Sequence, residues 1–313
     1  MSASRIAVVD IGTNTLLLLV AEPDGTGGLR SVHDDCRFGR LGQGLDASGE
    51  LAPEAIDRSL DIIRAYRADM DRLGVARVVA VGTQALREAR NAAAFVEPAS
   101  VLLGTAIEVV PGEREAELVS IAVTRTMPEL AGQTYAIADV GGGSTEIIVC
   151  AGAEVRSFTS VKLGSVRHKE RYLAHDPPEP TEVAAMFADI DRTLGAVSLP
   201  AGVPLVGTAG TATTIAAVEL GLDDYDADRI QGTRVSAAAI EAQLERFLGT
   251  DAEGRAHIPG VERQRADVIQ AGVAIYARLL RRLGTPEMIV SDRGIRWGLA
   301  WTIHQAGYEL PAQ

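Results

Sequence analysis

The sequence predicts an α/β protein of two domains, and three observations lead to that prediction. Two segments, Val8–Thr15 and Ile137–Glu146, each run from a short apolar stretch through an Asp into a glycine-rich turn, which indicates an internal duplication. Strand-like and helix-like stretches alternate along the chain, as expected for sheets covered by helices. With 313 residues and only 4% aromatic residues, the chain suits two cores built from Val, Ile, Leu and Ala.

The elements of the first domain follow from periodicity and from turn residues. Residues 5–21 predict a strand, a glycine turn and a second strand, and a return strand follows near Gly28–His33. Residues 53–73 repeat apolar side chains at helical spacing, between Pro53 in the first turn and Gly74 at the end. The remaining predicted elements are a strand at Arg77–Val81, a helix that begins over Ala85–Asn91, a strand at Ile107–Val110 and a helix at Glu113–Thr126.

The second domain is predicted to start near Thr134 with the same strand, glycine turn and strand. A stiff proline-rich loop, Pro177–Pro180, precedes a helix that begins at Thr181. The later predicted elements are strands at Ile147–Cys150, Ser157–Lys162, Pro204–Val206 and Glu287–Ser291, and helices from Thr181 to about Leu194, up to Leu220, and over Val235–Leu248, Arg265–Leu283 and Gly294–Gln305.

The composition limits the classes of function. The formal net charge of −12 argues against general nucleic-acid binding, which needs a basic surface, although local Arg and Lys clusters can still form a positive cleft. The two cysteines, Cys36 and Cys150, lie in no metal-ligand or redox spacing, which predicts a reduced, cytoplasmic protein. The longest apolar stretch near the start, Leu16–Ala21, is far shorter than the about 20 residues of a membrane span, so no membrane contact is expected.

The two glycine turns are candidate phosphate-binding loops. A sharply turning backbone exposes several N–H groups at one point, and such a cluster binds phosphate oxygens. The residues that would present these groups are Gly12, Thr13 and Asn14 in the first turn, and Gly141, Gly142, Gly143, Ser144 and Thr145 in the second. The alternative is a pair of ordinary hairpin turns, but the acidic residues at matched positions favour phosphate binding.

Asp10, Asp139 and Glu146 are the candidate metal ligands beside these turns. Mg²⁺ usually takes one or two carboxylates together with waters and substrate phosphate oxygens. The spacing leaves open which of the three carboxylates touches the metal directly, and whether one of them only caps a turn.

Six segments resemble the exopolyphosphatase and guanosine pentaphosphate phosphohydrolase (Ppx/GppA) family, which is part of the actin-like and sugar-kinase-like group of phosphotransferases. In the order of the family, they are residues 10–14 (DIGTN), 82–91 (GTQALREARN), 111–118 (PGEREAEL), 139–146 (DVGGGSTE), 163–167 (LGSVR) and 291–298 (SDRGIRWG). The first segment is common to the whole group, whereas its combination with the second and third is far more specific.

The resemblance implies a fold of two actin-like domains of the ribonuclease-H-like type, with a cleft between them. The N-terminal domain would span residues 1–127 and take back residues 299–313, and the C-terminal domain would span residues 128–298. The implied activity is hydrolysis of a terminal phosphoanhydride of inorganic polyphosphate with release of orthophosphate, or removal of the 5′-phosphate of guanosine pentaphosphate.

The resemblance also implies a cofactor and partners. Mg²⁺ is the expected cofactor, with another divalent cation or K⁺ as alternatives. Besides a substrate, the expected partners are guanosine tetraphosphate as an inhibitor and a second copy of the chain in a homodimer.

Glu115 is the predicted catalytic residue. Hydrolysis of a phosphoanhydride needs a carboxylate that orients a water molecule and accepts its proton, and in the family the Glu of Gly-x-x-Glu-Ala does so. Glu113 and Glu117 are close in sequence, but residues two apart on a helix point in different directions. Without the motif, an acid favoured by the dipole of the helix would be the simpler interpretation.

Several basic and small residues are predicted to contact the phosphate chain. Arg87 and Asn91 lie four apart on one predicted helix, so both can face one phosphate, with a solvated salt-bridging face as the alternative and Asn91 left open. Residues 162–171 predict a strand that lines a polyanion groove or, from His168 on, a solvated loop. The other candidates are Lys162 and Arg167 in this basic run, Arg293 and Arg296 near the last strand, and Gly207 and Thr208, where small residues let a substrate approach the backbone.

Two other classes of function remain as alternatives. An ATP-dependent kinase of the actin-like group would need an acceptor pocket, and the Gly-x-x-Glu-Ala segment argues for water as the acceptor instead. A sensor that binds polyphosphate or an alarmone without turnover would be favoured by loss of Glu115, which is present.

Overall fold

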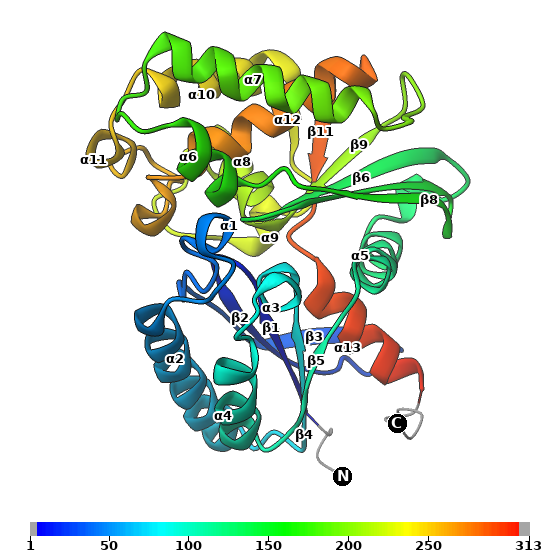
Figure 1. The fold of residues 1–313 in the computed structure, drawn as a ribbon. Helices are drawn as coiled ribbons and strands as arrows, with labels where there is room; N and C mark the ends of the chain where they lie inside the picture. Colours follow the sequence, from blue (N-terminus) through cyan, green and yellow to red (C-terminus); the bar gives the residue numbers. More distant parts are fainter. Residues whose placement is uncertain (1–4, 307–313) are drawn as a thin grey trace. The chain divides into compact units, whose positions relative to one another are not determined.

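The computed structural model describes residues 5–306, which form two compact units (Figure 1). Unit 1 contains the residues up to Ala122 together with those from Ile295 on, and unit 2 runs from Val123 to Gly294. The chain therefore returns to unit 1 with its last helix. The first division falls inside helix α5, Gly112–Thr126, so one continuous element carries the chain from unit 1 into unit 2.

Unit 1 is built on a five-stranded sheet with the order β3-β2-β1-β4-β5. The first three strands are antiparallel neighbours, whereas β4 runs parallel to β1 and β5 parallel to β4. Their bounds are β1 Ile6–Ile11, β2 Leu16–Pro23, β3 Leu29–Arg37, β4 Arg77–Gly82 and β5 Ile107–Val109. Strand β1 is buried at every position, as expected for the central strand of a sheet that is covered on both faces.

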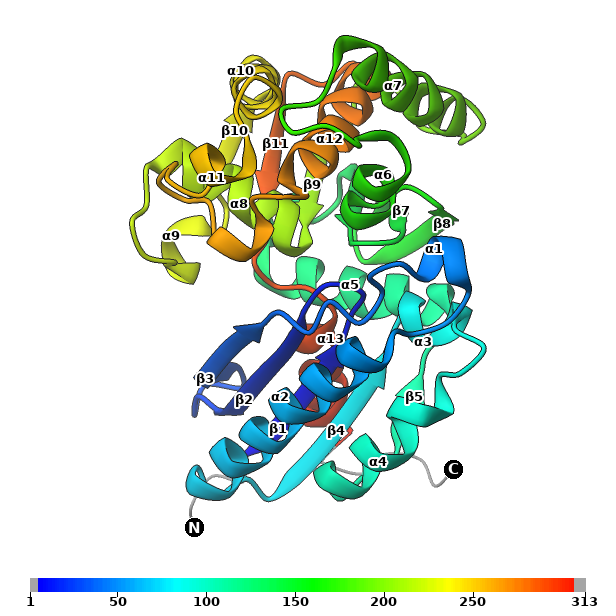
Figure 2. The same cartoon turned by 60° about the vertical axis from the view of Figure 1, so that its left-hand side comes forward.

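Helices cover both faces of this sheet. Val9 of β1 shares a core with Ile63 of α2 and Phe95 of α4. Helix α13 packs on β1 and β2 from the opposite face (Figure 2). The helices of unit 1 are α1 Leu45–Ser48, α2 Pro53–Arg72, α3 Gln84–Glu88, α4 Ala93–Leu103, α5 Gly112–Thr126 and α13 Ile295–Gln305.

Unit 2 is built on a six-stranded sheet with the order β10-β11-β9-β6-β7-β8. Strands β6, β7 and β8 are antiparallel neighbours, β9 and β11 follow in parallel, and β10 adds an antiparallel edge. Apart from β10, the order and the directions repeat those of unit 1. This repetition confirms the predicted fold class, an α/β protein of two actin-like, ribonuclease-H-like domains. The bounds are β6 Thr134–Val140, β7 Thr145–Ala151, β8 Glu154–Val161, β9 Leu205–Thr208, β10 Arg234–Ser236 and β11 Glu287–Val290.

The core of unit 2 lies between this sheet and the helices packed on it. Ala138 of β6, Ile190 of α7 and Ile275 of α12 belong to one buried cluster. The helices are α6 Ser165–Tyr172, α7 Pro180–Gly195, α8 Ala209–Leu220, α9 Ala227–Ile230, α10 Ala237–Leu248, α11 Ala252–Arg255 and α12 Ile269–Leu283, with short 3₁₀ turns at η1 Pro128–Leu130 and η2 Arg263–Arg265. Between residues 5 and 306, no helix is both long enough and apolar enough to cross a bilayer.

Several segments differ from the elements that the sequence predicts. Helix α4, which contains Pro98, has no counterpart among the predicted elements. The predicted helix Ala85–Asn91 is wrong in extent, since α3 ends at Glu88. The predicted strand or solvated loop over 162–171 is also wrong, because residues from Ser165 on form helix α6 with a buried first turn. Strand β10 occupies the predicted start of the Val235 helix.

Candidate functional site

The two glycine turns have the same local geometry. Asp10 is the penultimate residue of β1, and Asp139 is the penultimate residue of β6. In the first turn, the Gly12 amide donates to the Thr15 carbonyl at 2.9 Å, and in the second, Gly141 donates to Ser144 at 3.0 Å. Each turn therefore places an acidic side chain and a tight backbone reversal at the same end of a central strand.

The start of helix α6 holds the second glycine turn in place by donating hydrogen bonds to the carbonyl groups of the turn. The carbonyl of Gly141 accepts from the Ser165 amide at 3.0 Å, and that of Gly142 accepts from the Val166 amide at 2.9 Å. The carbonyl of Gly143 accepts from Nε of Arg167 at 2.7 Å.

The contacts with α6 fix the direction of the amides in this turn. In a planar trans peptide the N–H points away from the C=O of the same unit. The amides of Gly142, Gly143 and Ser144 therefore point away from α6, which is the arrangement of an anion-binding nest.

Gly164 allows α6 to approach this turn closely. A Cβ atom at Gly164 would lie 2.3 Å from the Gly142 carbonyl oxygen and 2.5 Å from the Gly143 carbonyl carbon. Real Cβ atoms do not come so near to backbone, so only glycine fits here without movement of the loop. The motif Leu163–Arg167 carried this signal in the sequence, but its supporting role was missed because α6 was not predicted.

The first turn is held in a similar way by a neighbouring loop of unit 1. The carbonyl of Thr13 accepts from the Gly42 amide at 2.9 Å, and that of Asn14 accepts from the Arg40 amide at 2.9 Å. The Thr13 hydroxyl donates to the Gln84 side chain at 2.8 Å, which ties the turn to the start of α3. The amides of Asn14 and Thr15 consequently point away from the supporting loop.

Two predicted metal ligands stand in one row across the sheet of unit 2. Asp139 of β6 lies directly opposite Glu146 of β7 and beside Thr208 of β9, so the three side chains share one face. The Thr208 hydroxyl donates to Oδ2 of Asp139 at 2.9 Å, and the Ser160 hydroxyl donates to Oε1 of Glu146 at 2.8 Å. These hydroxyls orient the two carboxylates on the face that they share.

The charge of this row favours a cation. Burial raises the pKa of Asp139, and the Thr208 hydrogen bond opposes that shift only in part. Like charges directly opposite on neighbouring strands repel one another. Two oriented carboxylates of this kind fit the oxygen ligands that Mg²⁺ takes. The third predicted ligand, Asp10, is buried in unit 1 on β1.

Glu115 is buried in the first turn of α5, with 7% of its surface exposed. Its Oε2 lies 3.0 Å from Nη1 of Arg87, and the same nitrogen donates to the Val110 carbonyl at 2.7 Å. The neighbouring acids Glu113 and Glu117 are exposed. The structure thus separates Glu115 from the two acids with which it could be confused in the sequence.

The prediction that Arg87 and Asn91 share one helix face is wrong. Asn91 lies beyond the end of α3, in a turn. Its side chain accepts from the Leu51 amide at 2.8 Å and donates to the Leu51 carbonyl at 3.0 Å. Both polar atoms of the amide are therefore used to hold the chain near Leu51.

The remaining predicted contacts have varied surroundings. Arg296 is buried in unit 1 and forms an ion pair with Asp34 of β3. Lys162 is exposed directly after β8, and Arg293 is partly exposed after β11. A Cβ at Gly207 would lie 2.4 Å from Sδ of Met288, so the small residue there is explained by packing between strands β9 and β11.

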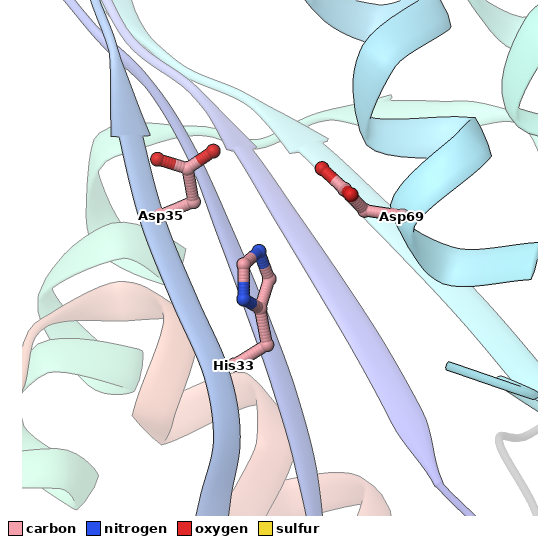
Figure 3. A group of neighbouring side chains, drawn as sticks. All are labelled: His33, Asp35 and Asp69. Carbon is pink, nitrogen blue, oxygen red and sulfur yellow. The ribbon is translucent and has the colours of Figure 1, made fainter. Parts of the chain in front are cut away.

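A separate group of possible metal ligands lies between β3 and α2 of unit 1 (Figure 3). His33, Asp35 and Asp69 each offer an atom within 4.8 Å of the others, and they are the only group of three found in the described part of the chain. The Arg37 guanidinium lies 2.8 Å from Asp35 and 3.3 Å from Asp69. Because a cation already pairs with both carboxylates, we assign this group to an ion-pair cluster.

Comparison with known proteins extends the similarity to nearly the whole chain. Residues 19–305 match the model of the Ppx/GppA phosphatase family. The chain is 35% identical to exopolyphosphatase 2 of Mycobacterium tuberculosis, in an alignment that covers 97% of this chain and 99% of that protein.

Solved structures agree with this assignment. The Ppx/GppA family member of Aquifex aeolicus is 30% identical, with a TM-score of 0.82 and coverage of 98% of this chain and 99% of that one. An exopolyphosphatase from Cytophaga hutchinsonii is 25% identical, with a TM-score of 0.87 and coverage of 97% and 98%. Together with the two glycine turns and their matched acidic residues, these similarities show that the chain belongs to the Ppx/GppA phosphatase family.

Proposed function

We propose that this protein is an exopolyphosphatase that hydrolyses the terminal phosphoanhydride bond of inorganic polyphosphate and releases orthophosphate. The observation that carries the proposal is the 35% identity, over 97% of this chain, to a protein named exopolyphosphatase 2. The geometry of each unit is consistent with that chemistry.

The glycine turns would bind phosphate oxygens through their amides. In unit 2 the amides of Gly142, Gly143 and Ser144 point to one side of the turn, and preorganised donors of this kind stabilise charge that develops on the transferred phosphoryl group. In unit 1, Glu115 would orient the attacking water and accept its proton. Arg87 would hold that carboxylate in place.

A divalent cation fits the carboxylate row of unit 2. Asp139 and Glu146 would hold Mg²⁺. When bound, the cation would neutralise negative charge on the phosphate oxygens. The hydroxyls of Thr208 and Ser160 would keep the two carboxylates oriented toward it.

Guanosine pentaphosphate is the second candidate substrate, because the matching family model covers both phosphatase types. Both substrates end in a phosphoanhydride. A comparison of initial rates on polyphosphate and on guanosine pentaphosphate, under the same Mg²⁺ concentration, would rank the two activities.

The test is orthophosphate release from a medium-length polyphosphate with Mg²⁺, for the native chain and for Glu115→Gln. We expect release by the native chain and a loss of about 10²-fold or more in the variant, the usual contribution of a general base. The matched control is Glu113→Gln, an exposed acid two residues earlier in the same helical turn, which should keep the native rate. No release from polyphosphate by the native chain would overturn the proposal.

A further inference from the structure

We infer that Arg167 is a positioning residue, which acts on phosphate through the Gly143 carbonyl of the second glycine turn and not by contact with the substrate. The inference rests on the proposed function, because it assigns a part in phosphate binding to this turn. It replaces the sequence-based prediction that Arg167 binds the phosphate chain itself.

The internal duplication allows the hydrogen bond of Arg167 to be compared with the equivalent hydrogen bond in the first glycine turn. By their position after the strand, Asn14 in the first turn and Gly143 in the second are equivalent, since the tight turns close from Gly12 to Thr15 and from Gly141 to Ser144. The Asn14 carbonyl accepts from a backbone amide, that of Arg40, at 2.9 Å. The Gly143 carbonyl accepts from Nε of Arg167 at 2.7 Å.

A side-chain donor in unit 2 thus replaces a backbone donor in unit 1. The two donors satisfy the same carbonyl of the same kind of turn. The one N–H of the Arg40 amide is used by the Asn14 carbonyl, and Nε–H of Arg167 is used in the same way by the Gly143 carbonyl, so we assign the same structural action to both groups.

The carbonyl groups and the amide groups of the second turn point to opposite sides, and Arg167 lies on the carbonyl side. Nε lies on the carbonyl side of the turn, together with the first amides of α6. The amide of Ser144, in the same peptide unit as the Gly143 carbonyl, points to the other side. By its bond to the Gly143 carbonyl, Arg167 therefore sets the direction of the Ser144 amide, and it does so from the side of the turn opposite to the one on which phosphate would bind.

The same contact strengthens that amide as a donor. Hydrogen bonds in a chain polarise one another, and a bond from a charged donor is about twice as strong as a neutral one. Arg167 is 5% exposed, so its charge is little screened by water. The guanidinium thus both orients the Ser144 peptide and draws electron density toward the carbonyl end of that peptide.

Two substitutions separate the Nε hydrogen bond from the rest of the side chain. Arg167→Gln places an amide nitrogen at the same number of bonds from Cα as Nε, so it keeps a donor to Gly143 and loses the charge. Arg167→Met has nearly the same shape up to that position and offers no donor. The control for lost surface charge on the same helix is Arg171→Met, at an exposed position.

The readouts are kcat and KM for hydrolysis of inorganic tripolyphosphate with Mg²⁺, together with calorimetric binding of tripolyphosphate without Mg²⁺. We expect Arg167→Met to lower kcat about 10- to 100-fold, with a smaller change in KM. This loss approaches the effect of removing one preorganised hydrogen-bond donor altogether. Arg167→Gln should recover most of that loss, and Arg171→Met should match the native chain. Circular dichroism should show all three variants folded.

Three outcomes would overturn the inference. An equal loss in the Gln and Met variants, seen mainly as a raised KM, would mean that the guanidinium charge contacts substrate directly. Native kcat in Arg167→Met would mean that the contact only supports the fold. If the decrease in kcat were proportional to the decrease in melting temperature across the variants, reduced stability would explain the loss and Arg167 would have no positioning role.

The binding measurement separates this inference from the proposed function. If the native chain binds tripolyphosphate and does not hydrolyse it, the proposed activity fails, and the order of affinities should still be native, Gln, then Met. If that order is absent while hydrolysis is present, the inference alone fails. A native chain that neither binds nor hydrolyses the anion would overturn both.

Discussion

Oε2 of Glu115 lies 3.0 Å from Nη1 of Arg87, and the same nitrogen also donates to the carbonyl of Val110, directly after β5. The hydrogen bond to the backbone fixes the position of the guanidinium that contacts the Glu115 carboxylate. Because the Glu115 side chain is 9% exposed and that of Arg87 is 23% exposed, water competes little for this contact. The direction of the proposed base is thus set by a fixed group and not by solvent.

The first prediction concerns this ion pair. Arg87→Met should lower the rate of orthophosphate release about 10- to 100-fold, because a misplacement of about 1 Å in a reacting group can cost 10²-fold. Arg90→Met is the matched control, since Arg90 is exposed and its guanidinium pairs with the exposed Glu50 at 3.1 Å. Steady-state rates at saturating substrate test the prediction, and an unchanged kcat in Arg87→Met would contradict it.

The second prediction is that the Asp139–Glu146 row costs stability in the absence of metal. Asp139→Asn should raise the unfolding free energy by about 0.5–1 kcal/mol at neutral pH without Mg²⁺, because it removes one of two like charges directly opposite each other. Addition of Mg²⁺ should raise the melting temperature of the native chain but not of the variant.

The control for the second prediction is Glu154→Gln, an exposed acid on β8 that pairs with Arg156. This variant should keep the native response to Mg²⁺ in thermal scans. A melting temperature of Asp139→Asn below that of the metal-free native chain would show that the two carboxylates do not oppose each other.

The third prediction concerns the close packing of α6 on the glycine turn. Gly164→Ala should lower kcat by about 10-fold or more, because its Cβ would meet the Gly142 carbonyl oxygen at 2.3 Å and displace the turn. Gly195→Ala is the matched control, since a Cβ at that helical position would meet no atom within 4 Å beyond its chain neighbours and the backbone of its own helix. The control should be stabilised by roughly 0.5–1 kcal/mol and keep its rate, and equal rates in both variants would contradict the prediction.

Much of the fold and part of the candidate site can be predicted from local sequence patterns. Both strand–turn–strand units, with Asp10 and Asp139 at their strand ends, followed from apolar runs beside glycines. The motif selects Glu115 from among three acids, and Glu115 is the buried one of the three. These features depend on neighbours close in the chain, which periodicity and turn chemistry describe.

The features that the sequence did not reveal depend on tertiary contacts. Nothing local in residues 162–171 indicates that Arg167 bonds to Gly143 or that His168 is fully buried, since arginine and lysine, which dominate this run, are usually exposed. Likewise, the use of Asn91 to hold Leu51 depends on a contact between residues that lie 40 apart. A spacing of four residues suggested one helix face there, but the helix ends too early.

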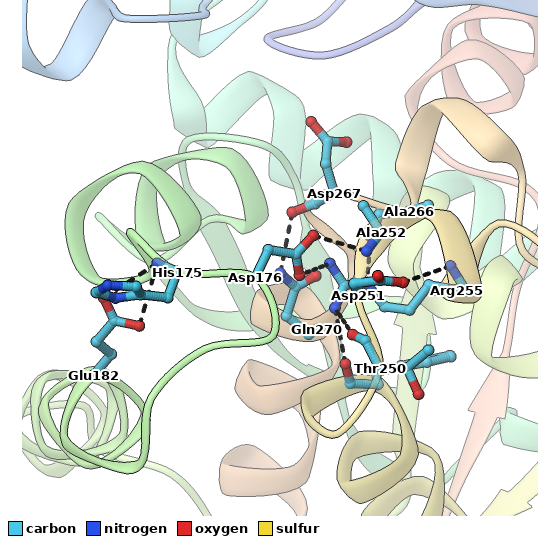
Figure 4. Close-up of polar contacts among 12 residues, drawn as sticks. His175, Asp176, Glu182, Thr250, Asp251, Ala252, Arg255, Ala266, Asp267 and Gln270 are labelled. Carbon is cyan, nitrogen blue, oxygen red and sulfur yellow. Dashed lines mark hydrogen bonds and ion pairs between the residues drawn. The ribbon is translucent and has the colours of Figure 1, made fainter.

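The fourth prediction concerns Arg255, a fully buried arginine in unit 2 (Figure 4). Its guanidinium donates to the carbonyls of Ala266, Phe247 and Thr250, and Nη2 pairs with Asp176 at 2.8 Å. Arg255→Met should cost at least about 1–3 kcal/mol of unfolding free energy, because the buried carbonyls of Ala266 and Phe247 lose their donor.

Urea denaturation of the Arg255 variant measures this cost. The matched control is Arg263→Met, an exposed arginine that pairs with Glu253 and should change stability by less than about 1 kcal/mol. A loss in Arg255→Met no larger than that of the control would show that the network adds nothing to stability.

The fifth prediction is a pH dependence with opposite signs at two histidines of unit 2. Burial lowers the pKa of His168 below its usual 6.5, and the Asp189 carboxylate opposes that shift without reversing it. The unfolded chain then binds a proton at His168 more readily, so its contribution to stability is complete above about pH 6.5 and is lost as the pH falls below that value. The side chains of Arg171 and Tyr172 also face this imidazole.

His175 should act in the other direction. A hydrogen bond with Glu182, together with the charge of Glu179, raises the pKa of His175 above 6.5. Its contribution to stability is therefore present below about pH 6.5 and is lost as the pH rises through its folded pKa. Urea denaturation between pH 5.5 and 8 (approximate limits chosen around the ordinary pKa of His) measures both effects.

The two variants should change the pH profile oppositely. His168→Gln should flatten the loss of stability on the acid side, which for one proton has a limiting slope of about 1.4 kcal/mol per pH unit. His175→Gln should make that loss steeper, because a group that gains stability from protonation is removed. Parallel profiles for His168→Gln and the native chain would mean that the imidazole of His168 is as free to ionise in the fold as in the unfolded chain.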